Sequence, residues 1–396
     1  MQSPVAVIFE RLGPYHHARL RSAARRGPIV GIQVVTKDTT YQWDAITSCK
    51  GFRSITLFSQ GFGMPPILAV VKEMWRQLDR EMPAAIAIPG WRAPEAVSAL
   101  AWAIDHEVPA ILMCESQAPN HRRWIAKEAC KQRLVSLCSA ALAGGSRQRE
   151  YVATLGLHSD YIFIGYDVVD NQHFAQGADT IRCDSGSRSR LHLPERFFLA
   201  SCRFIPEKNL SRLLVGYARY RKAAADAWGL VLLGDGPLSE QVRSTLHQLG
   251  LESSVLLPGF KQYEELPAYY GLADAFVHPS IREPWGLVVN EAMASGLPVL
   301  VSARCGCVSD LVDEGRNGWT FDPFDVESFA ELMLRVSRMT REERLAMGRA
   351  GQEIIARWTP ETFAEGLWRA VEVAMTAPRP HATSLDKALL WFLTHR

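Results

Sequence analysis

The sequence lacks the marks of several protein classes. None of its eight cysteines forms a C-x-x-C pair or lies beside clustered histidines, which favours reduced thiols over disulfides or zinc ligands. No apolar run approaches the roughly 20 residues of a membrane-spanning helix, and the start, MQSPVAVIFE, lacks the charged and apolar regions of a signal peptide. The formal net charge is only +2 over 396 residues, which argues against a dedicated nucleic-acid-binding protein. We therefore expect a cytoplasmic globular protein without a nucleic-acid partner.

Short β-rich runs alternate with amphipathic helical stretches in both halves of the chain, a pattern typical of parallel sheets built from βα units. The expected strands are Val5–Glu10, Ile29–Thr36, Ile55–Phe58, Ala84–Ile88, Ala110–Cys114, Ala140–Gly144, Tyr161–Gly165, Phe197–Cys202, Leu230–Leu233, Val255–Leu257, Ala275–His278 and Val299–Ser302. After Asp325 the pattern predicts helices only, and no repeat of 20–50 residues is apparent. The sequence thus predicts two doubly wound α/β domains in tandem.

A polar segment separates the two sets of βα units, and we interpret residues 170–194 as an interdomain linker. The predicted domains are Rossmann-like and cover residues 1–169 and 195–360, and helices over 361–396 are expected to pack back on the first domain. Open parallel sheets bind ligands beyond the carboxyl ends of their strands, so two such domains facing each other predict a deep cleft. A nicotinamide dehydrogenase has a similar architecture, but neither first βα turn carries the G-x-G-x-x-G motif that it requires.

The segment SIREPWGLVVNEAMASGLP, at 280–298, places Glu283 ahead of an expected helix and Glu291 within it. The backbone N–H groups of Trp285, Gly286 and Leu287 at the start of that helix are suited to a diphosphate, which the missing side chain of Gly286 allows to approach closely. Carboxylates accept hydrogen bonds from vicinal hydroxyls, so Glu291 is suited to a ribose and Glu283 to a donor sugar. The alternative is that Glu283 only charges the helix N-terminus and that Glu291 lies on a solvated face.

The spacing E-x7-E followed by AMASGLPV, with HPS upstream, resembles the hallmark of the retaining family 4 (group 1) glycosyltransferases. The resemblance is strong over about Tyr161–Asp325. It implies the GT-B fold, in which two Rossmann-like domains face each other, and the transfer of a sugar from a nucleoside diphosphate sugar with retention of configuration. It also implies that Glu283 orients the donor sugar and that Glu291 holds the ribose.

Two further segments resemble the same family in the expected order. The turn ASCRFIPEKNL, at 200–210, implies that Arg203 and Lys208 neutralise the diphosphate as the leaving group gains charge. Without the resemblance, both side chains would be interpreted as solvated cations. The turns LLGDGPL and LPGFK border the nucleobase pocket in the family, which makes Gly234, Gly236 and Gly259 candidate backbone contacts of the donor.

The N-terminal half resembles the family more loosely. Its first βα turn, RLGPYHHARL, has one glycine, Gly13, where many members have two that approach the donor. His16 and His17 are candidates for hydrogen bonds to an acceptor or a donor phosphate, with a helix cap or partly buried packing as the alternative. Glu115 and His121 follow the fifth expected strand, where they face the acceptor and the transferred sugar unless they only cap a helix.

These observations predict a metal-independent glycosyltransferase without a cofactor, because no D-x-D triplet offers ligands for a metal on the diphosphate. Its partners are a nucleotide-sugar donor and a sugar or glycolipid acceptor, and the family implies a role in bacterial cell-surface polysaccharide or glycolipid assembly. The alternative is a non-catalytic nucleotide-sugar-binding relative of the same fold. Two basic segments, 16–26 and 122–133, are suited either to peripheral contact with the inner face of a membrane or to solvated helix faces.

Overall fold

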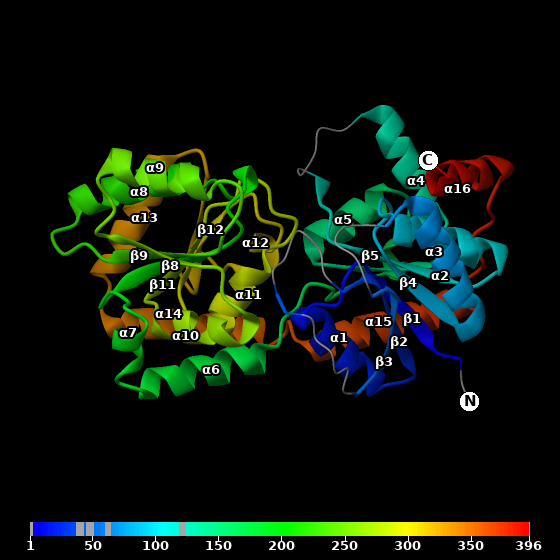
Figure 1. Ribbon diagram of the computed structural model, residues 1–396, viewed down its shortest axis with the longest axis horizontal. Helices are drawn as coiled ribbons and strands as arrows, with labels where there is room; N and C mark the ends of the chain where they lie inside the picture. Colours follow the sequence, from blue (N-terminus) through cyan, green and yellow to red (C-terminus); the bar gives the residue numbers. More distant parts are fainter. Residues whose placement is uncertain (1–2, 37–42, 45–50, 60–64, 119–123, 396) are drawn as a thin grey trace. The chain divides into compact units, whose positions relative to one another are not determined.

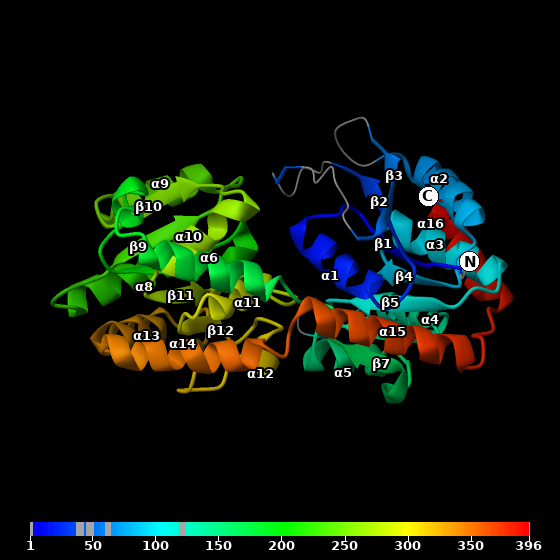
Figure 2. The ribbon, with the colours of Figure 1, turned by 90° about the horizontal axis from the view of Figure 1, so that it is seen from below.

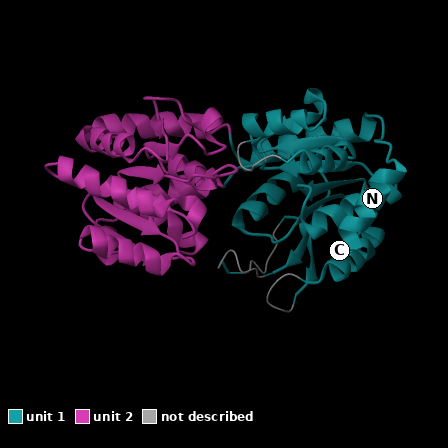
Figure 3. Cartoon of the chain, turned by 90° about the horizontal axis from the view of Figure 1, so that it is seen from above, with its two compact units in different colours: residues 1–169, 358–396 teal, residues 170–357 magenta. Residues whose placement is uncertain are grey.

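The chain divides into two compact units, which Figure 3 shows in different colours. The computed structural model describes residues 3–36, 43–44, 51–59, 65–118 and 124–395. Unit 1 consists of Met1–Val169 together with Trp358–Arg396, and unit 2 consists of Asp170–Arg357. The last part of the chain therefore returns to the unit in which the chain begins.

Unit 1 is a seven-stranded parallel sheet with the strand order β3-β2-β1-β4-β5-β6-β7 (Figure 1). Its elements are β1 (Val5–Phe9), α1 (Pro14–Ala24), β2 (Ile29–Val35), β3 (Arg53–Phe58), α2 (Ile67–Glu81), β4 (Ala85–Pro89), α3 (Pro94–Asp105), β5 (Ala110–Cys114), α4 (Ile125–Ser136), β6 (Ala140–Ala143), α5 (Ser146–Thr154), η2 (Ser159–Tyr161), β7 (Ile162–Ile164), α15 (Pro360–Thr376) and α16 (Ser384–His395). The order of the strands reverses between β1 and β4, which is where a doubly wound sheet binds its ligand.

Both faces of this sheet are covered, which explains why its strands are apolar runs rather than alternating ones. Side chains such as Ile8, Ile86 and Leu112 belong to a buried core that also contains residues of α2, α3 and α16. Helix α1 packs against α15, which also contacts β6 and β7. Figures 1 and 2 both show α16 beside α3, and α1 beside α15.

Unit 2 is a six-stranded parallel sheet with the order β10-β9-β8-β11-β12-β13, the same doubly wound pattern. Its elements are α6 (Asn171–Cys183), α7 (Ser187–Arg190), β8 (Phe197–Ser201), η3 (Pro206–Lys208), α8 (Leu210–Ala223), β9 (Gly229–Leu233), α9 (Ser239–Leu249), β10 (Val255–Gly259), η4 (Tyr263–Glu265), α10 (Leu266–Leu272), β11 (Ala275–His278), α11 (Leu287–Ala294), β12 (Val299–Ser302), α12 (Val308–Leu311), β13 (Gly318–Phe321), α13 (Val326–Arg338) and α14 (Arg341–Ile355). The order of the strands reverses between β8 and β11. The residues that follow these two strands belong to the motifs around Lys208 and Glu283.

Two features of unit 2 differ from the sequence prediction. The sequence analysis did not predict β13, a four-residue strand at the edge of the sheet that pairs with β12. The segment 170–194, interpreted as a linker, contains α6 and α7 and lies in unit 2. Helix α6 packs closely on α10 because small residues meet there: Gly177 lies against Pro267, and Gly271 lies against Ala178.

Candidate active site

The segment between β11 and α11 is fixed by backbone hydrogen bonds to its neighbours. The N–H of Gly306 donates to the carbonyl of Glu283 at 3.1 Å, and the N–H of Cys307 donates to the carbonyl of Trp285 at 3.2 Å. On its other side, the N–H of Ile281 donates to the carbonyl of Glu207 at 2.9 Å. The loop that carries Glu283 is thus held between η3 and the residues that precede α12.

Glu283 is the centre of a buried polar cluster. Its Oε2 accepts hydrogen bonds from the Nζ of Lys208, from the Nε2 of His278 at 2.8 Å and from the Oγ of Ser280 at 3.1 Å. Burial by itself raises the pKa of Glu283, but the adjacent Lys208 and His278 outweigh it and hold the pKa well below its usual range. Burial lowers the pKa of His278, so at neutral pH this imidazole is neutral while Glu283 is ionised.

The position of Lys208 follows from the turn that joins η3 to α8. Asn209 adopts the left-handed conformation, with φ 58°, which ends η3 directly before α8 begins. Its side-chain amide donates to the carbonyls of Pro279 and Pro323, at 3.1 and 2.8 Å. Asn209 therefore ties the lysine turn to the loop that carries the glutamate, although the two lie far apart in the sequence.

Helix α11 begins at Leu287, slightly later than the start at Trp285 or Gly286 that the sequence indicated. Gly286 is its N-cap and has φ 109°, a conformation that favours glycine. A Cβ at this position would lie 3.4 Å from the Cγ of Glu283 and 3.7 Å from the Nε2 of His278. The indole of Trp285 is buried and donates to the Oδ1 of Asn290 at 2.9 Å. The contribution of Trp285 to a ligand is thus limited to its backbone, as the sequence analysis assumed.

Glu291 lies on α11 in a different environment from Glu283. It is fully buried, and its Oε2 accepts a hydrogen bond of 2.6 Å from the hydroxyl of Tyr270. Tyr270 is held by the rings of Phe174 and Phe276, each 5.7 Å away. The solvated helix face that the sequence analysis left open for Glu291 is therefore wrong.

The turn with Arg203 packs tightly against the glycine turn after β9. Gly234 has φ 130° and Gly236 has φ 156°, and added Cβ atoms would lie 1.8 Å from the carbonyl oxygen of Cys202 and 2.7 Å from that of Phe204. The N–H of Gly234 also donates to the carbonyl of Gly259 at 3.0 Å. Gly234 and Gly236 are thus required by close backbone packing around Arg203, whatever they contact in a ligand.

The histidines of the first βα turn make internal contacts. Gly13 is the N-cap of α1, and its N–H donates to the Nδ1 of His16 at 3.0 Å, while the ring of His17 is buried and lies 5.4 Å from that of Phe52. Burial lowers the pKa of His17 to about 4 and lowers that of His16 well below its usual value. These contacts match the alternative of capping and packing. In the same helix Arg19 is buried against Asp167, so neither alternative for the basic segment 16–26, membrane contact or a solvated face, applies to this arginine.

Two carboxylates lie where strands of unit 1 end. Glu115 follows β5 and is exposed, whereas His121 lies outside the described residues. The sequence analysis missed Glu95, in the first turn of α3 after β4, which is 1% exposed. Its Oε2 has no hydrogen-bond partner in the part of the chain that the structure describes. Burial, with a smaller effect of Glu10, raises the pKa of Glu95 to about 7.

Replacing Glu95 with glutamine should change how stability depends on pH. Below pH 4.5 the carboxyl is protonated in both the folded and the unfolded chain, and above pH 7 it is ionised in both. Between these values only the unfolded chain releases the proton, so the wild type loses stability as the pH rises. As the pH rises from 5 to 8, we expect the free energy of unfolding of Glu95→Gln to increase by about 2 kcal/mol relative to that of the wild type. Urea unfolding at each pH measures this difference. The exposed Glu365→Gln is the control, and an equal gain there would contradict the prediction.

The comparisons with known proteins agree with this geometry. Residues 187–354, most of unit 2, match the family model described as glycosyl transferases group 1. This segment of the chain is similar to the group 1 glycosyl transferases. The matched range contains Arg203, Lys208, Glu283 and Glu291, so the resemblance based on these motifs is confirmed.

Curated relatives match up to about half of the chain. A GDP-mannose-dependent alpha-(1-6)-phosphatidylinositol monomannoside mannosyltransferase of Mycobacterium tuberculosis is 29% identical over 211 residues, which are 50% of this chain and 54% of the relative. Sulfoquinovosyl transferase SQD2 of Arabidopsis thaliana is 40% identical over 127 residues, which are 31% of this chain and 24% of the relative. The chain spans about half the length of the mycobacterial relative that it matches.

Solved structures extend the likeness in fold to nearly the whole chain. Sucrose-phosphate synthase from Thermosynechococcus elongatus has a TM-score of 0.73 at 18% identity, covering 93% of this chain and 98% of that one. Anabaena HepE in complex with UDP and glucose has a TM-score of 0.72 at 17% identity, covering 94% and 100%. The two-unit α/β fold of the GT-B type is thereby confirmed. Within the described ranges, no helix is both long and apolar enough to span a membrane.

Proposed function

We propose that the chain transfers a sugar from a nucleoside diphosphate sugar to an acceptor, with retention of configuration and without a metal ion. The observation that carries this proposal is the cluster of Glu283, Lys208 and His278 beside Gly286, the N-cap of α11. The cluster combines a fixed cation, a fixed carboxylate and a helix N-terminus at the carboxyl edge of a doubly wound sheet. These are the groups that a sugar diphosphate requires.

In the proposed reaction, the bond between the anomeric carbon and the diphosphate oxygen breaks, and its electron pair stays with the diphosphate. The leaving group gains negative charge, which Arg203, Lys208 and the backbone N–H groups of Trp285, Gly286 and Leu287 stabilise. The acceptor hydroxyl forms the new bond on the same face of the sugar, and its proton passes to the departing diphosphate oxygen. Because no side chain is required to attack the sugar, the protein acts by positioning and charge.

Glu283 is proposed to orient the donor sugar. It is ionised, and three donors fix its Oε2, so the carboxylate is preorganised for the sugar hydroxyls. Tyr270 holds Glu291 in the same way, which supports the proposal that Glu291 accepts the ribose hydroxyls. On unit 1 we propose that Glu115, exposed after β5, and His121 contact the acceptor and the transferred sugar. His16, His17 and Gly13 shape the turn of α1 on that side.

The names of relatives support a nucleotide-sugar donor and a place in cell-surface assembly. The mycobacterial relative is named as GDP-mannose-dependent, and the Anabaena structure holds UDP and glucose. A further relative is a putative colanic acid biosynthesis glycosyltransferase of Salmonella typhimurium. We therefore propose a role in bacterial polysaccharide or glycolipid assembly.

The donor is tested first by thermal unfolding with UDP, GDP, ADP, their sugar conjugates and NAD. A ligand that binds only the folded protein at a hundredfold excess over its Kd stabilises it by about 2.7 kcal/mol. We expect one nucleoside diphosphate and its sugar conjugate to raise the melting temperature. We also expect the protein to consume that sugar conjugate at the same rate with and without EDTA. A shift with NAD alone would contradict the proposal. A shift without consumption of the sugar conjugate would favour a non-catalytic relative, and activity restored only by magnesium or manganese would contradict metal independence.

A further inference from the structure

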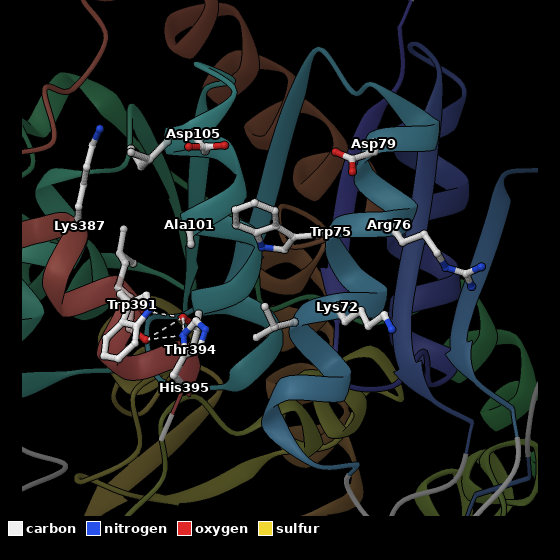
Figure 4. Close-up of a pocket in the computed structure, with 13 residues that line it drawn as sticks. Lys72, Trp75, Arg76, Asp79, Ala101, Asp105, Lys387, Trp391, Thr394 and His395 are labelled. Carbon is white, nitrogen blue, oxygen red and sulfur yellow. Dashed lines mark hydrogen bonds between the residues drawn. The ribbon is translucent and has the colours of Figure 1, made fainter.

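Unit 1 contains a groove that the proposed reaction does not use. It lies between α2, α3 and α16 and encloses a volume of about 710 Å³ (Figure 4). Ala101 and Ile104 of α3 line it between the other two helices, while Trp75 of α2 and Trp391 of α16 contribute the largest rings to its walls. The size and the aromatic and aliphatic lining are those of a site for a small apolar ligand.

Helix α16 is fixed in place and yet exposes apolar side chains. Leu390 is buried in the core of unit 1, and Asp386 accepts hydrogen bonds from the Nη1 of Arg133 at 2.8 Å and from the Oγ1 of Thr383 at 2.6 Å. On this anchored helix, Trp391, which lines the groove, is 63% exposed, and the next residue, Phe392, is 59% exposed. A large aromatic side chain that is mostly in water at the border of an apolar groove, as Trp391 is, is typical of a binding surface.

The charges along the groove differ between its two ends. Asp79 and Asp105, from the last turns of α2 and α3, lie at one end together with Lys387 (Figure 4). Asp79 accepts a hydrogen bond of 2.7 Å from the indole of Trp102. At the other end Figure 4 shows Lys72 and His395. Within the described ranges the ammonium of Lys72 forms no ion pair, so this end offers a cation to an anionic group.

The end with Lys72 is also the one nearer to the candidate acceptor side. Helix α2 begins at Ile67, after the carboxyl end of β3, and Lys72 lies five residues further on, about 7.5 Å along the helix axis. The carboxyl ends of the parallel strands share one edge of the sheet, the edge that also carries Glu115. A molecule lying in the groove with its head group at Lys72 would therefore point that head toward the edge with Glu115.

We infer that this groove binds the apolar chain of an anionic amphiphile, with the phosphate or other anionic head group on Lys72. The inference rests on the proposed function and gives the acceptor a chemical class, a sugar or phosphate carried on a lipid chain. The two tryptophans enclose the chain, and at the opposite end the carboxylates of Asp79 and Asp105 outnumber the one lysine, Lys387, which disfavours the reverse orientation of the head group.

Dodecyl phosphate below its micelle concentration is the probe, with binding to the full chain measured by calorimetry. We expect saturable binding, and no binding of inorganic phosphate at the same concentration. Lys72→Glu should weaken binding about tenfold or more, which corresponds to about 1.4 kcal/mol. Ala101→Phe should abolish it by filling the groove. Lys222→Glu, an exposed lysine on α8 of unit 2, is the matched control and should leave binding unchanged.

The outcomes separate this inference from the proposed function. Dodecyl phosphate that does not bind, or that binds equally to Lys72→Glu, would overturn the inference, as would binding of the protein only to anionic vesicles and not to the single amphiphile. In each case the thermal shift with the nucleotide donor, which depends on unit 2, still reports on the proposed function. Should Ala101→Phe fail to fold, the surface variant Lys72→Glu decides the question alone.

Discussion

Replacing Glu283 with glutamine is expected to lower kcat by at least about 100-fold while changing the affinity for the nucleotide much less. Glutamine has nearly the same shape, so Ser280 keeps an acceptor, but the negative charge opposite Lys208 is lost. A neutral amide also presents an N–H group where the sugar hydroxyls require an acceptor. Initial rates over a range of donor concentrations measure the split between kcat and KM.

The matched control for this variant is Glu207→Gln. Glu207 lies on η3 next to Lys208, but it is partly exposed and forms an ion pair of 3.6 Å with Arg282. Exposed ion pairs of this kind contribute little to stability. The kinetics of Glu207→Gln should therefore remain those of the wild type. Arg203→Ala should lower both turnover and donor binding, because Arg203 is proposed to act on the diphosphate itself. Unchanged kinetics in Glu283→Gln would reject the assigned role.

Stability at low pH provides a second readout for Glu283. Its pKa is lowered in the folded protein, so its contribution to stability is present above about pH 4.5 and is lost as the pH falls. The glutamine variant lacks this contribution and removes the negative charge opposite the buried ammonium of Lys208, for which we expect a loss of about 3 kcal/mol at pH 7. The difference between the two proteins should shrink as the pH falls below 4.5. A folded variant at pH 7 is required before its kinetics are interpreted.

Hydrophobic runs were enough to predict most strands, because both sheets are parallel and covered on both faces. Runs such as those of β5, β11 and β12 coincide with the predicted ranges. Strand β13 was missed because its four residues, GWTF, follow a polar turn and form only one edge of the sheet. Helix α6 was missed because most of its surface is polar and its burial depends on contact with α10, which the local sequence does not reveal.

The sequence analysis named several residues of the candidate site, but it did not predict the contacts between them. The motif spacing and the family resemblance indicated Lys208 and Glu283 separately, yet their pairing depends on Asn209, whose side chain bonds to two distant carbonyls. His278 was noticed only as part of a motif, and its bond to Glu283 requires the strand end and the loop to fold together. Glu95 gave no signal at all, because its raised pKa is a result of burial beneath elements that are distant in the sequence.

Substituting alanine for Gly234 should have the largest effect on stability. The new Cβ would lie 1.8 Å from the carbonyl oxygen of Cys202, and the backbone has φ 130°, which L-residues rarely adopt. Strain and overpacking together are expected to cost about 3–5 kcal/mol, measured by urea unfolding.

Gly259→Ala separates the two causes of the loss expected for Gly234→Ala. Gly259 also has a positive φ, 79°, but nothing lies within 4 Å of its added Cβ. Gly259→Ala should therefore lower the free energy of unfolding by only about 1–2 kcal/mol, the cost of backbone strain without a clash. The Gly234 variant should in addition raise the KM for the donor, because relief of the clash displaces the turn that carries Arg203, directly after Cys202. Equal losses of stability in the two variants would show that close packing against that turn is not what requires glycine at position 234.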